Sequence, residues 1–182
     1  MPYDLFEHRH RFAVWAAARA TQRGFTSVDT LRDALASTDI EIFVRDHAVE
    51  PISCDGFRER HGKWCNSIVE FLADAVVQNT SFGRAAKLVA VYLKSMVVVG
   101  PHSTSNLARV AHPPIDRILL RGLTKIPGLP QHAKNTFRST NWTTLSAEDY
   151  YPLIELIRES VPEIDPFWRL EQYWTVTQES EV

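Results

Sequence analysis

The 182-residue sequence is poor in the features that mark secreted and membrane-spanning proteins. Cys54 and Cys65 are its only cysteines, so we expect no disulfide framework and both thiols reduced. The N-terminal stretch MPYDLFEHRHRF has no apolar signal core, and apolar runs such as MVVV at 96–99 are far too short to span a bilayer. These absences predict a cytoplasmic protein with no membrane partner.

Acidic residues are scarce in the middle of the chain. Residues 79–147 hold nine Lys or Arg and a single acid, Asp116, which lies within HPPIDRILLRG. Residues 1–78 hold nine basic and twelve acidic side chains, and residues 148–182 hold two and nine. A basic middle between acidic ends predicts a surface that binds a polyanion. The alternative is an internal match, in which acidic C-terminal helices pack across the basic segment.

Composition is that of an ordinary globular domain. Hydrophobic residues make up 45% and charged residues 23% of the chain, and five Trp, nine Phe and five Tyr argue against disorder. This length supports one domain with a real core and is too short for two comfortable ones. We therefore predict a single domain over residues 1–182.

Helical periodicity dominates the sequence and predicts an all-α fold, a single compact multi-helix domain. N-terminal helices are expected within 1–80, a central pair within 81–123, and C-terminal helices within 146–175. Residues 40–49 alternate partly and fit a strand or a helix, with the helix favoured. The individual helices are expected at 8–22, 28–37, 57–79, 83–100, 113–123, 147–160 and 162–174, with Ser27 and Ser146 as the N-caps of the helices at 28–37 and 147–160. KIPGLPQHAKNTF at 125–137 is expected to be a turn followed by a short helix.

Three basic residues share one face of the helix expected at 83–100. Arg84, Lys87 and Lys94 recur at spacings of three and seven, opposite an apolar face that includes Leu88 and Tyr92. Arg84 and Lys87 lie in the first turn, where the helix dipole is also positive, and such a place suits a phosphate. The same positive field lowers the pKa of a lysine, and a deprotonated lysine is a nucleophile. A solvated surface lysine is the common alternative.

Asp116 is expected in the first turn of the helix that Pro113 and Pro114 open. An acid there satisfies free N–H groups and the helix dipole, which is reason enough for its presence. A lone carboxylate within a basic surface can also hold a cationic intermediate, activate a water or orient a lysine.

The segments SFGRAAKLVAVYL (81–93) and PPIDRILLRGL (113–123) together resemble the core of the helix-hairpin-helix DNA glycosylase superfamily, and most of all its 8-oxoguanine glycosylase branch. The resemblance implies a protein that excises or recognises a modified purine base in DNA. It implies that Lys87 attacks the sugar C1′ and forms a Schiff base, and that Asp116 supports this attack and the developing oxocarbenium charge. Gly83 would be the hairpin glycine, and Arg84 would lie near a backbone phosphate.

Further residues are assigned to nucleic-acid binding around this core, namely Lys94, His112, Arg117 and Arg121. Trp142, Trp168 and Trp174 are able either to stack a flipped base or to fill the core, and we assign stacking to Trp168. Cys54, His61 and Cys65 are potential zinc ligands, but their uneven spacing matches no standard zinc pattern. No phosphate-binding loop or dinucleotide fingerprint is visible, so we expect neither a metal nor another cofactor.

Two other functions fit the same residues. A non-catalytic module would keep the fold and the basic face and would bind a modified base, a nucleotide or RNA. An interaction protein would instead dock its basic middle on an acidic partner, such as a companion enzyme from a neighbouring gene in a bacterial antiviral defence cluster.

Overall fold

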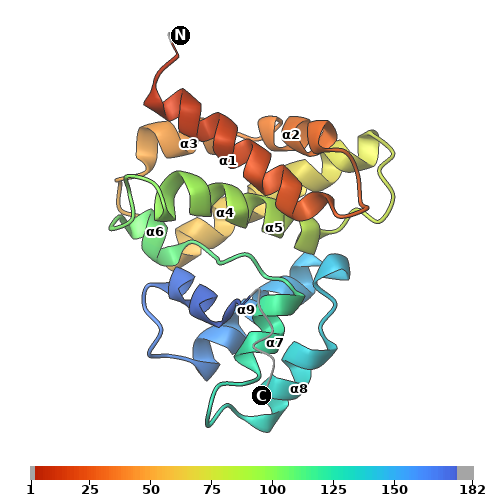
Figure 1. The fold of residues 1–182 in the computed structure, drawn as a ribbon, viewed down its shortest axis with the longest axis vertical. Helices are drawn as coiled ribbons and strands as arrows, with labels where there is room; N and C mark the ends of the chain where they lie inside the picture. Colours follow the sequence, from red (N-terminus) through yellow and green to blue (C-terminus); the bar gives the residue numbers. More distant parts are fainter. Residues whose placement is uncertain (1–2, 176–182) are drawn as a thin grey trace.

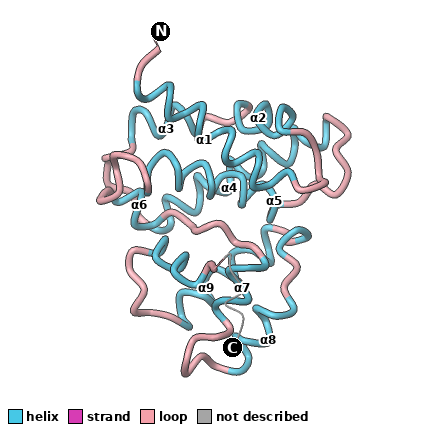
Figure 2. The backbone as a smooth tube through the Cα atoms, in the orientation of Figure 1, coloured by secondary structure: helices cyan, strands magenta, loops and turns pink. Residues whose placement is uncertain are grey.

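The computed structural model describes residues 3–175, and within that range the chain is helical and contains no strand (Figure 1, Figure 2). The all-α class predicted from the sequence is therefore confirmed for these residues. The α-helices are α1 (Leu5–Gln22), α2 (Val28–Ala36), α3 (Ile40–His47), α4 (Cys54–Asp74), α5 (Phe82–Leu93), α6 (Asn106–Val110), α7 (Arg117–Leu123), α8 (Gln131–Ser139) and α9 (Ala147–Ser160). A π-helical segment, η1 (Lys94–Val98), extends α5, and two 3₁₀ helices, η2 (Trp142–Thr144) and η3 (Phe167–Tyr173), lie near α9 in the sequence.

Most helices begin where a short polar side chain accepts a backbone N–H from the first turn. This capping satisfies N–H groups that have no partner within the helix. Ser27 and Ser146 cap α2 and α9, as the sequence predicts. The same role falls to Asp4, Ser53, Ser81, Ser105 and Asp116 at the starts of α1, α4, α5, α6 and α7.

Several expected helix bounds are wrong, and each has a local cause. The helix expected over 57–79 begins at Cys54 and ends at Asp74, before the positive φ angles of Val76 and Asn79. The helix expected over 113–123 begins only at Arg117, because Asp116 is extended and serves as its N-cap. The last aromatic segment forms a 3₁₀ helix rather than an α-helix. Residues 40–47 are helical, which confirms the favoured choice for that segment.

The molecule has two tiers that meet along α5 (Figure 1). In the upper tier α5 packs against α1 and α4, and α2 packs against α1 and α4. In the lower tier α7 packs against α8 and η3, and α8 packs against α9. Contacts of α5 with α9 and η2 join the tiers, so the residues of α5 that point down lie at the junction.

Helix α1 turns an aromatic face to solvent. The sequence places Phe12, Trp15, Ala16 and Arg19 on one face, and the structure exposes Phe12, Trp15 and Arg19 while burying Ala13, Ala17 and Ala18. Small residues let α1 lie close to α5, which accounts for the buried face. No helix among the described residues is long and apolar enough to cross a bilayer.

Candidate active site

Lys87 and Asp116 meet inside the protein at the junction of the tiers. The Lys87 amine lies 3.0 Å from Asp116 Oδ2, although 29 residues separate them in sequence. Lys87 is 4% exposed and Asp116 is 6% exposed. The alternative of a solvated surface lysine is therefore wrong for Lys87, because α5 is buried around most of its circumference.

Four donors contact the Asp116 carboxylate, namely the Lys87 amine, two backbone N–H groups and an indole N–H. Its Oδ1 accepts the backbone N–H groups of Ile118 at 2.9 Å and Leu119 at 3.0 Å, which is the N-cap of α7. The indole N–H of Trp174 donates to the same carboxylate, at 3.2 Å from Oδ1 and 3.1 Å from Oδ2. Asp116 therefore caps α7 and contacts Lys87 at the same time. Its role as a helix cap and its role as the partner of a lysine are compatible.

The pKa of each partner follows from burial and from its neighbours. Burial lowers the pKa of Lys87, the Asp116 carboxylate opposes this, and the charges of Arg23 and Arg84 add to the lowering. Burial by itself would raise the pKa of Asp116, but the N–H of Leu119, the charge of Lys87 and the indole of Trp174 bring it below its ordinary value. The amine is thus easier to deprotonate than usual, and the carboxylate stays ionised.

Trp142 lies against the lysine. The Lys87 amine is 4.5 Å from the centre of a Trp142 ring, and the Arg84 guanidinium is 5.9 Å from it. The position of η2 depends on Gly83, whose N–H donates to the Leu145 carbonyl at 3.0 Å. A Cβ at Gly83 would lie 2.0 Å from the Trp142 carbonyl oxygen. The glycine expected in a hairpin thus allows η2 to approach α5 closely, and its N–H already has a partner.

Two residues of the basic middle are paired with the acidic C-terminal region. Lys94 contacts Glu171 of η3, and Arg109 contacts Asp165. The internal match between basic and acidic segments is real at these places. Five other basic side chains lie on or between α7 and α8 and form no ion pair within residues 3–175; we call them the α7–α8 basic surface, and they are Arg117, Arg121, Lys125, Lys134 and Arg138.

His112, expected near Asp116 in a nucleic-acid site, is buried in an aromatic cluster. Its Nδ1 lies 3.2 Å from the Tyr150 hydroxyl, and its ring centre is 4.9 Å from that of His61. His61 in turn stacks on Tyr150 at 5.4 Å and lies 3.1 Å from the Tyr151 hydroxyl. Burial lowers the pKa of His61 to about 3 and holds the pKa of His112 well below its ordinary value. Both rings are therefore neutral near pH 7.

The cysteines and the tryptophans fall into distinct environments. Cys54 is exposed and Cys65 is buried, with its sulfur 3.6 Å from His61 Nε2. Within residues 3–175 no group of three His, Cys, Asp or Glu side chains is placed to hold a metal ion. Trp168, predicted from the sequence to stack a base, is half-buried, whereas the tryptophans that contact the Lys87–Asp116 pair are Trp142 and Trp174.

The sequence offers Trp142 and Trp174 as candidates for the site but gives no reason to prefer them over Trp168. Their positions depend on how η2 packs against α5 and how the segment after η3 packs against α7. The spacing of residues along the sequence does not predict this tertiary packing. The close approach at Gly83 is equally invisible in the sequence.

Comparison with models of protein families, with curated proteins and with solved structures finds no match to this chain.

Proposed function

We propose that this protein is a DNA glycosylase of the helix-hairpin-helix type that acts on a modified purine base, with Lys87 as nucleophile and Asp116 as its partner. The observation that carries the proposal is the buried contact of 3.0 Å between the Lys87 amine and the Asp116 carboxylate. A nucleophilic amine needs a nearby group that accepts its proton or balances the charge it creates, within hydrogen-bond reach.

The proposed reaction uses groups that are present at the pair. The deprotonated amine of Lys87 forms a bond to C1′ of the deoxyribose while the bond from C1′ to the base breaks. The base leaves with the bonding electrons and takes up the proton that the attacking nitrogen loses. The bond from C1′ to the ring oxygen then breaks, the second proton of the nitrogen passes to that oxygen, and the Schiff base forms. Because C1′ becomes positively charged as the base departs, the ionised Asp116 lowers the energy of that state. The pair is buried, so the reacting nucleotide reaches it only if a covering side chain moves. The nucleotide has to come from a single strand or be flipped out of a duplex.

The α7–α8 basic surface supports nucleic acid as the substrate. Helix α7, the turn at 124–130 and α8 form a helical hairpin, with a positive φ of 76° at Gly128 in the turn. Arg117, Arg121, Lys125 and Arg138 are exposed on this hairpin. Basic side chains that are not neutralised by acids attract phosphates and release counterions on binding.

A non-catalytic nucleic-acid-binding module is the second candidate. It is favoured by the capping bonds of Asp116, because a carboxylate that starts α7 and neutralises a buried lysine has a structural reason to exist. Such a module would bind through the α7–α8 basic surface, and the lysine would never react.

Borohydride trapping separates the two candidates. The protein is incubated with duplex and single-stranded oligonucleotides that carry 8-oxoguanine, deazaguanine, uracil or an abasic site, and reduced with borohydride. We expect a covalent adduct that Lys87→Gln abolishes and that Lys63→Gln, an exposed lysine of α4, leaves unchanged. Asp116→Asn should slow its formation by about 10²–10³-fold, the usual cost of removing one group that stabilises the charge of the transition state.

Circular dichroism of each variant shows whether it is folded. No adduct and no released base, with salt-sensitive binding retained, would establish the non-catalytic module. The absence of both adduct and binding would leave the basic surface to a protein partner, and the proposed function would be wrong.

A further inference from the structure

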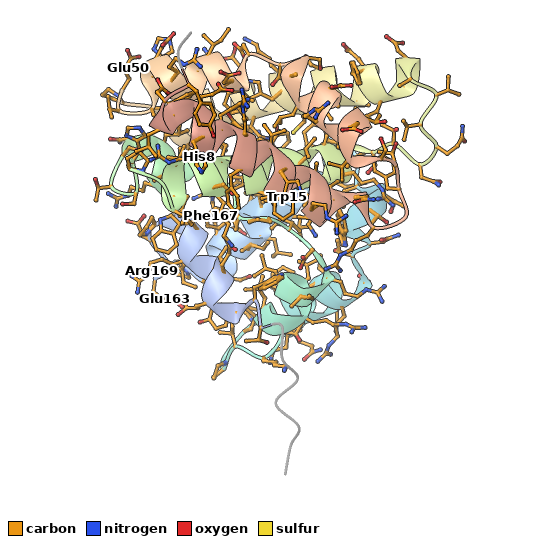
Figure 3. All side chains as sticks on the ribbon, turned by 45° about the horizontal axis from the view of Figure 1, so that its top comes forward. His8, Trp15, Glu50, Glu163, Phe167 and Arg169 are labelled. Atoms are coloured by element: carbon orange, nitrogen blue, oxygen red, sulfur yellow. The ribbon has the colours of Figure 1, made fainter. Side chains whose placement is uncertain are left out.

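The exposed face of α1 carries an aromatic pair that the folded core does not use. Phe12 is 58% exposed and Trp15 is 54% exposed, and their ring centres lie 6.0 Å apart. His8 precedes this pair by four residues, the two aromatic residues are three apart, and Arg19 follows by four. These spacings place the four side chains in one stripe along the helix. We call it the α1 stripe; His8 and Trp15 are marked along α1 in Figure 3.

The α1 stripe lies in a stretch without acids. Between Glu7 and Asp29 the chain has no Asp or Glu, but it has Arg9, Arg11, Arg19 and Arg23. Arg11 is bound to Glu7, while Arg19 and Arg23 form no ion pair within residues 3–175. This local positive charge is not visible in the net charge of residues 1–78, which is negative. A ligand that binds the stripe should therefore carry negative charge.

The residues that follow α1 lie near the helix that carries Lys87. Arg23 follows α1, and its charge is one of those that lower the pKa of Lys87. Phe25 comes next, and the Arg84 guanidinium lies 4.2 Å from its ring centre. The Nε of Arg84 is buried and has no hydrogen-bond partner within residues 3–175. The segment that follows α1 therefore contacts α5 at Arg84, one helical turn before Lys87.

We propose that the α1 stripe binds a single-stranded segment of nucleic acid that flanks the nucleotide held at Lys87 and Asp116. Bases stack on Phe12 and Trp15, and phosphates lie on Arg19, Arg23 and Arg84. Aromatic faces combined with basic side chains are the recognition chemistry of single strands. From Phe12 to Arg23 the axis of α1 rises about 16 Å, which is long enough for several nucleotides. This inference rests on the proposed function, because it extends the substrate of the same site.

The test measures binding of a fluorescein-labelled, unmodified single-stranded 20-mer of thymidines by anisotropy, at low and moderate salt. For Phe12→Ala/Trp15→Ala we expect Kd to rise at least about fivefold per ring removed, the value for loss of one stacked base. Trp15→Phe keeps a ring and should stay within about twofold of wild type. Ile42→Ala/Val49→Ala removes exposed apolar side chains of α3 and the segment after it, and should leave Kd unchanged.

Arginine variants test the phosphate contacts separately. Arg19→Gln/Arg23→Gln should lower the slope of log K against log salt by about 1.4, which is 0.7 for each lost phosphate contact. The aromatic double variant should leave that slope unchanged, because it removes no charge.

Poly-L-glutamate is the competitor that represents an acidic protein. If it displaces the 20-mer as well as unlabelled thymidine 20-mer does, and its affinity also falls in Phe12→Ala/Trp15→Ala, the stripe binds acidic proteins and the proposal is wrong. Unchanged oligonucleotide affinity in that variant, or no binding by wild type, would also overturn it.

The two proposals fail separately. Stripe-dependent binding of the 20-mer without any borohydride adduct would keep the α1 stripe as a binding surface and refute the glycosylase. An adduct that depends on Lys87, together with 20-mer binding that does not depend on the stripe, would support the glycosylase and refute the α1 stripe as a binding surface.

Discussion

At the scale of single residues, the Lys87–Asp116 pair is expensive to bury and has to be well satisfied. A charged group moved out of water costs several kcal/mol, and a close opposite charge with further hydrogen bonds offsets that cost. Asp116 obtains these bonds from Ile118, Leu119 and Trp174, and Lys87 obtains a ring face from Trp142. Each partner is therefore stable in its charged form only while the other is present.

A double-mutant cycle measures that dependence. Lys87→Met and Asp116→Asn should each lower the free energy of unfolding by about 3 kcal/mol or more, since each leaves an unpaired buried charge. Asn is itself a good N-cap, so Asp116→Asn removes the charge and keeps much of the start of α7. The double variant should lose clearly less than the sum of the single variants in urea denaturation. Losses that add to within about 0.5 kcal/mol would show that the two charges are not coupled.

At the scale of elements, the pair depends on how η3 returns to α7. Gly122 of α7 faces the backbone of Tyr173, and a Cβ there would lie 1.9 Å from the Tyr173 carbonyl oxygen. This contact brings the next residue, Trp174, to the Asp116 carboxylate. A glycine near the end of one helix thus decides whether the carboxylate has its indole donor.

Gly122→Ala should separate α7 from the segment at Tyr173. We expect the free energy of unfolding to fall by about 1–3 kcal/mol, as for other overpacked sites. We also expect the indole N–H of Trp174 to exchange faster with solvent, as followed by NMR. Gly128→Ala is the matched control, because Gly128 has a positive φ but open space around it. It should cost about 1 kcal/mol for the strained backbone and leave the Trp174 exchange rate unchanged. Equal behaviour of the two variants would show that the approach at Gly122 does not position Trp174.

Sequence reasoning recovered the elements that local rules encode. Periodicity and capping residues such as Ser27 and Ser146 located most helices. The resemblance to the glycosylases singled out Lys87 and Asp116, but nothing in the sequence showed that the two side chains meet, and their contact is a finding of the structure. The helix at 113–123 was begun too early, because two prolines fit a first turn as well as they fit an extended lead-in. Trp142 and Trp174 could not be chosen, since their places depend on tertiary returns rather than on spacing.

At the scale of the whole molecule, the distribution of charge over the surface differs from its distribution along the chain. Part of the basic middle is neutralised by Glu171 and Asp165, Lys87 is buried against Asp116, and five other basic side chains lie on the α7–α8 basic surface. The α1 stripe adds a second positive region in the upper tier, while the net charge of the chain is only −2. Net charge by itself therefore says little about what this molecule binds.

The junction of the tiers also contains the neutral histidines, and these predict how the whole fold responds to acid. His61 and His112 have pKa values below their ordinary value of 6.5 because they are buried, with His61 at about 3. The charges of Arg158 and Arg58 lower the pKa of His112 further. The unfolded chain therefore binds protons at these histidines below about pH 6.5, where the folded chain does not, and folding becomes less favourable as the pH falls.

We expect the free energy of unfolding to fall below pH 6.5 by about 1.4 kcal/mol per pH unit for each of the two histidines. Asp116 adds to the loss only below its ordinary pKa of 3.8, because its carboxylate is stabilised in the folded protein. Urea denaturation at a series of pH values between 7 and 4.5 measures the slope. His112→Phe should reduce it by one histidine's share, whereas His132→Gln, at an exposed histidine of α8, should leave it unchanged. Stability that does not change over this range would mean that the buried rings accept protons in the folded state, and the junction would then have to admit water.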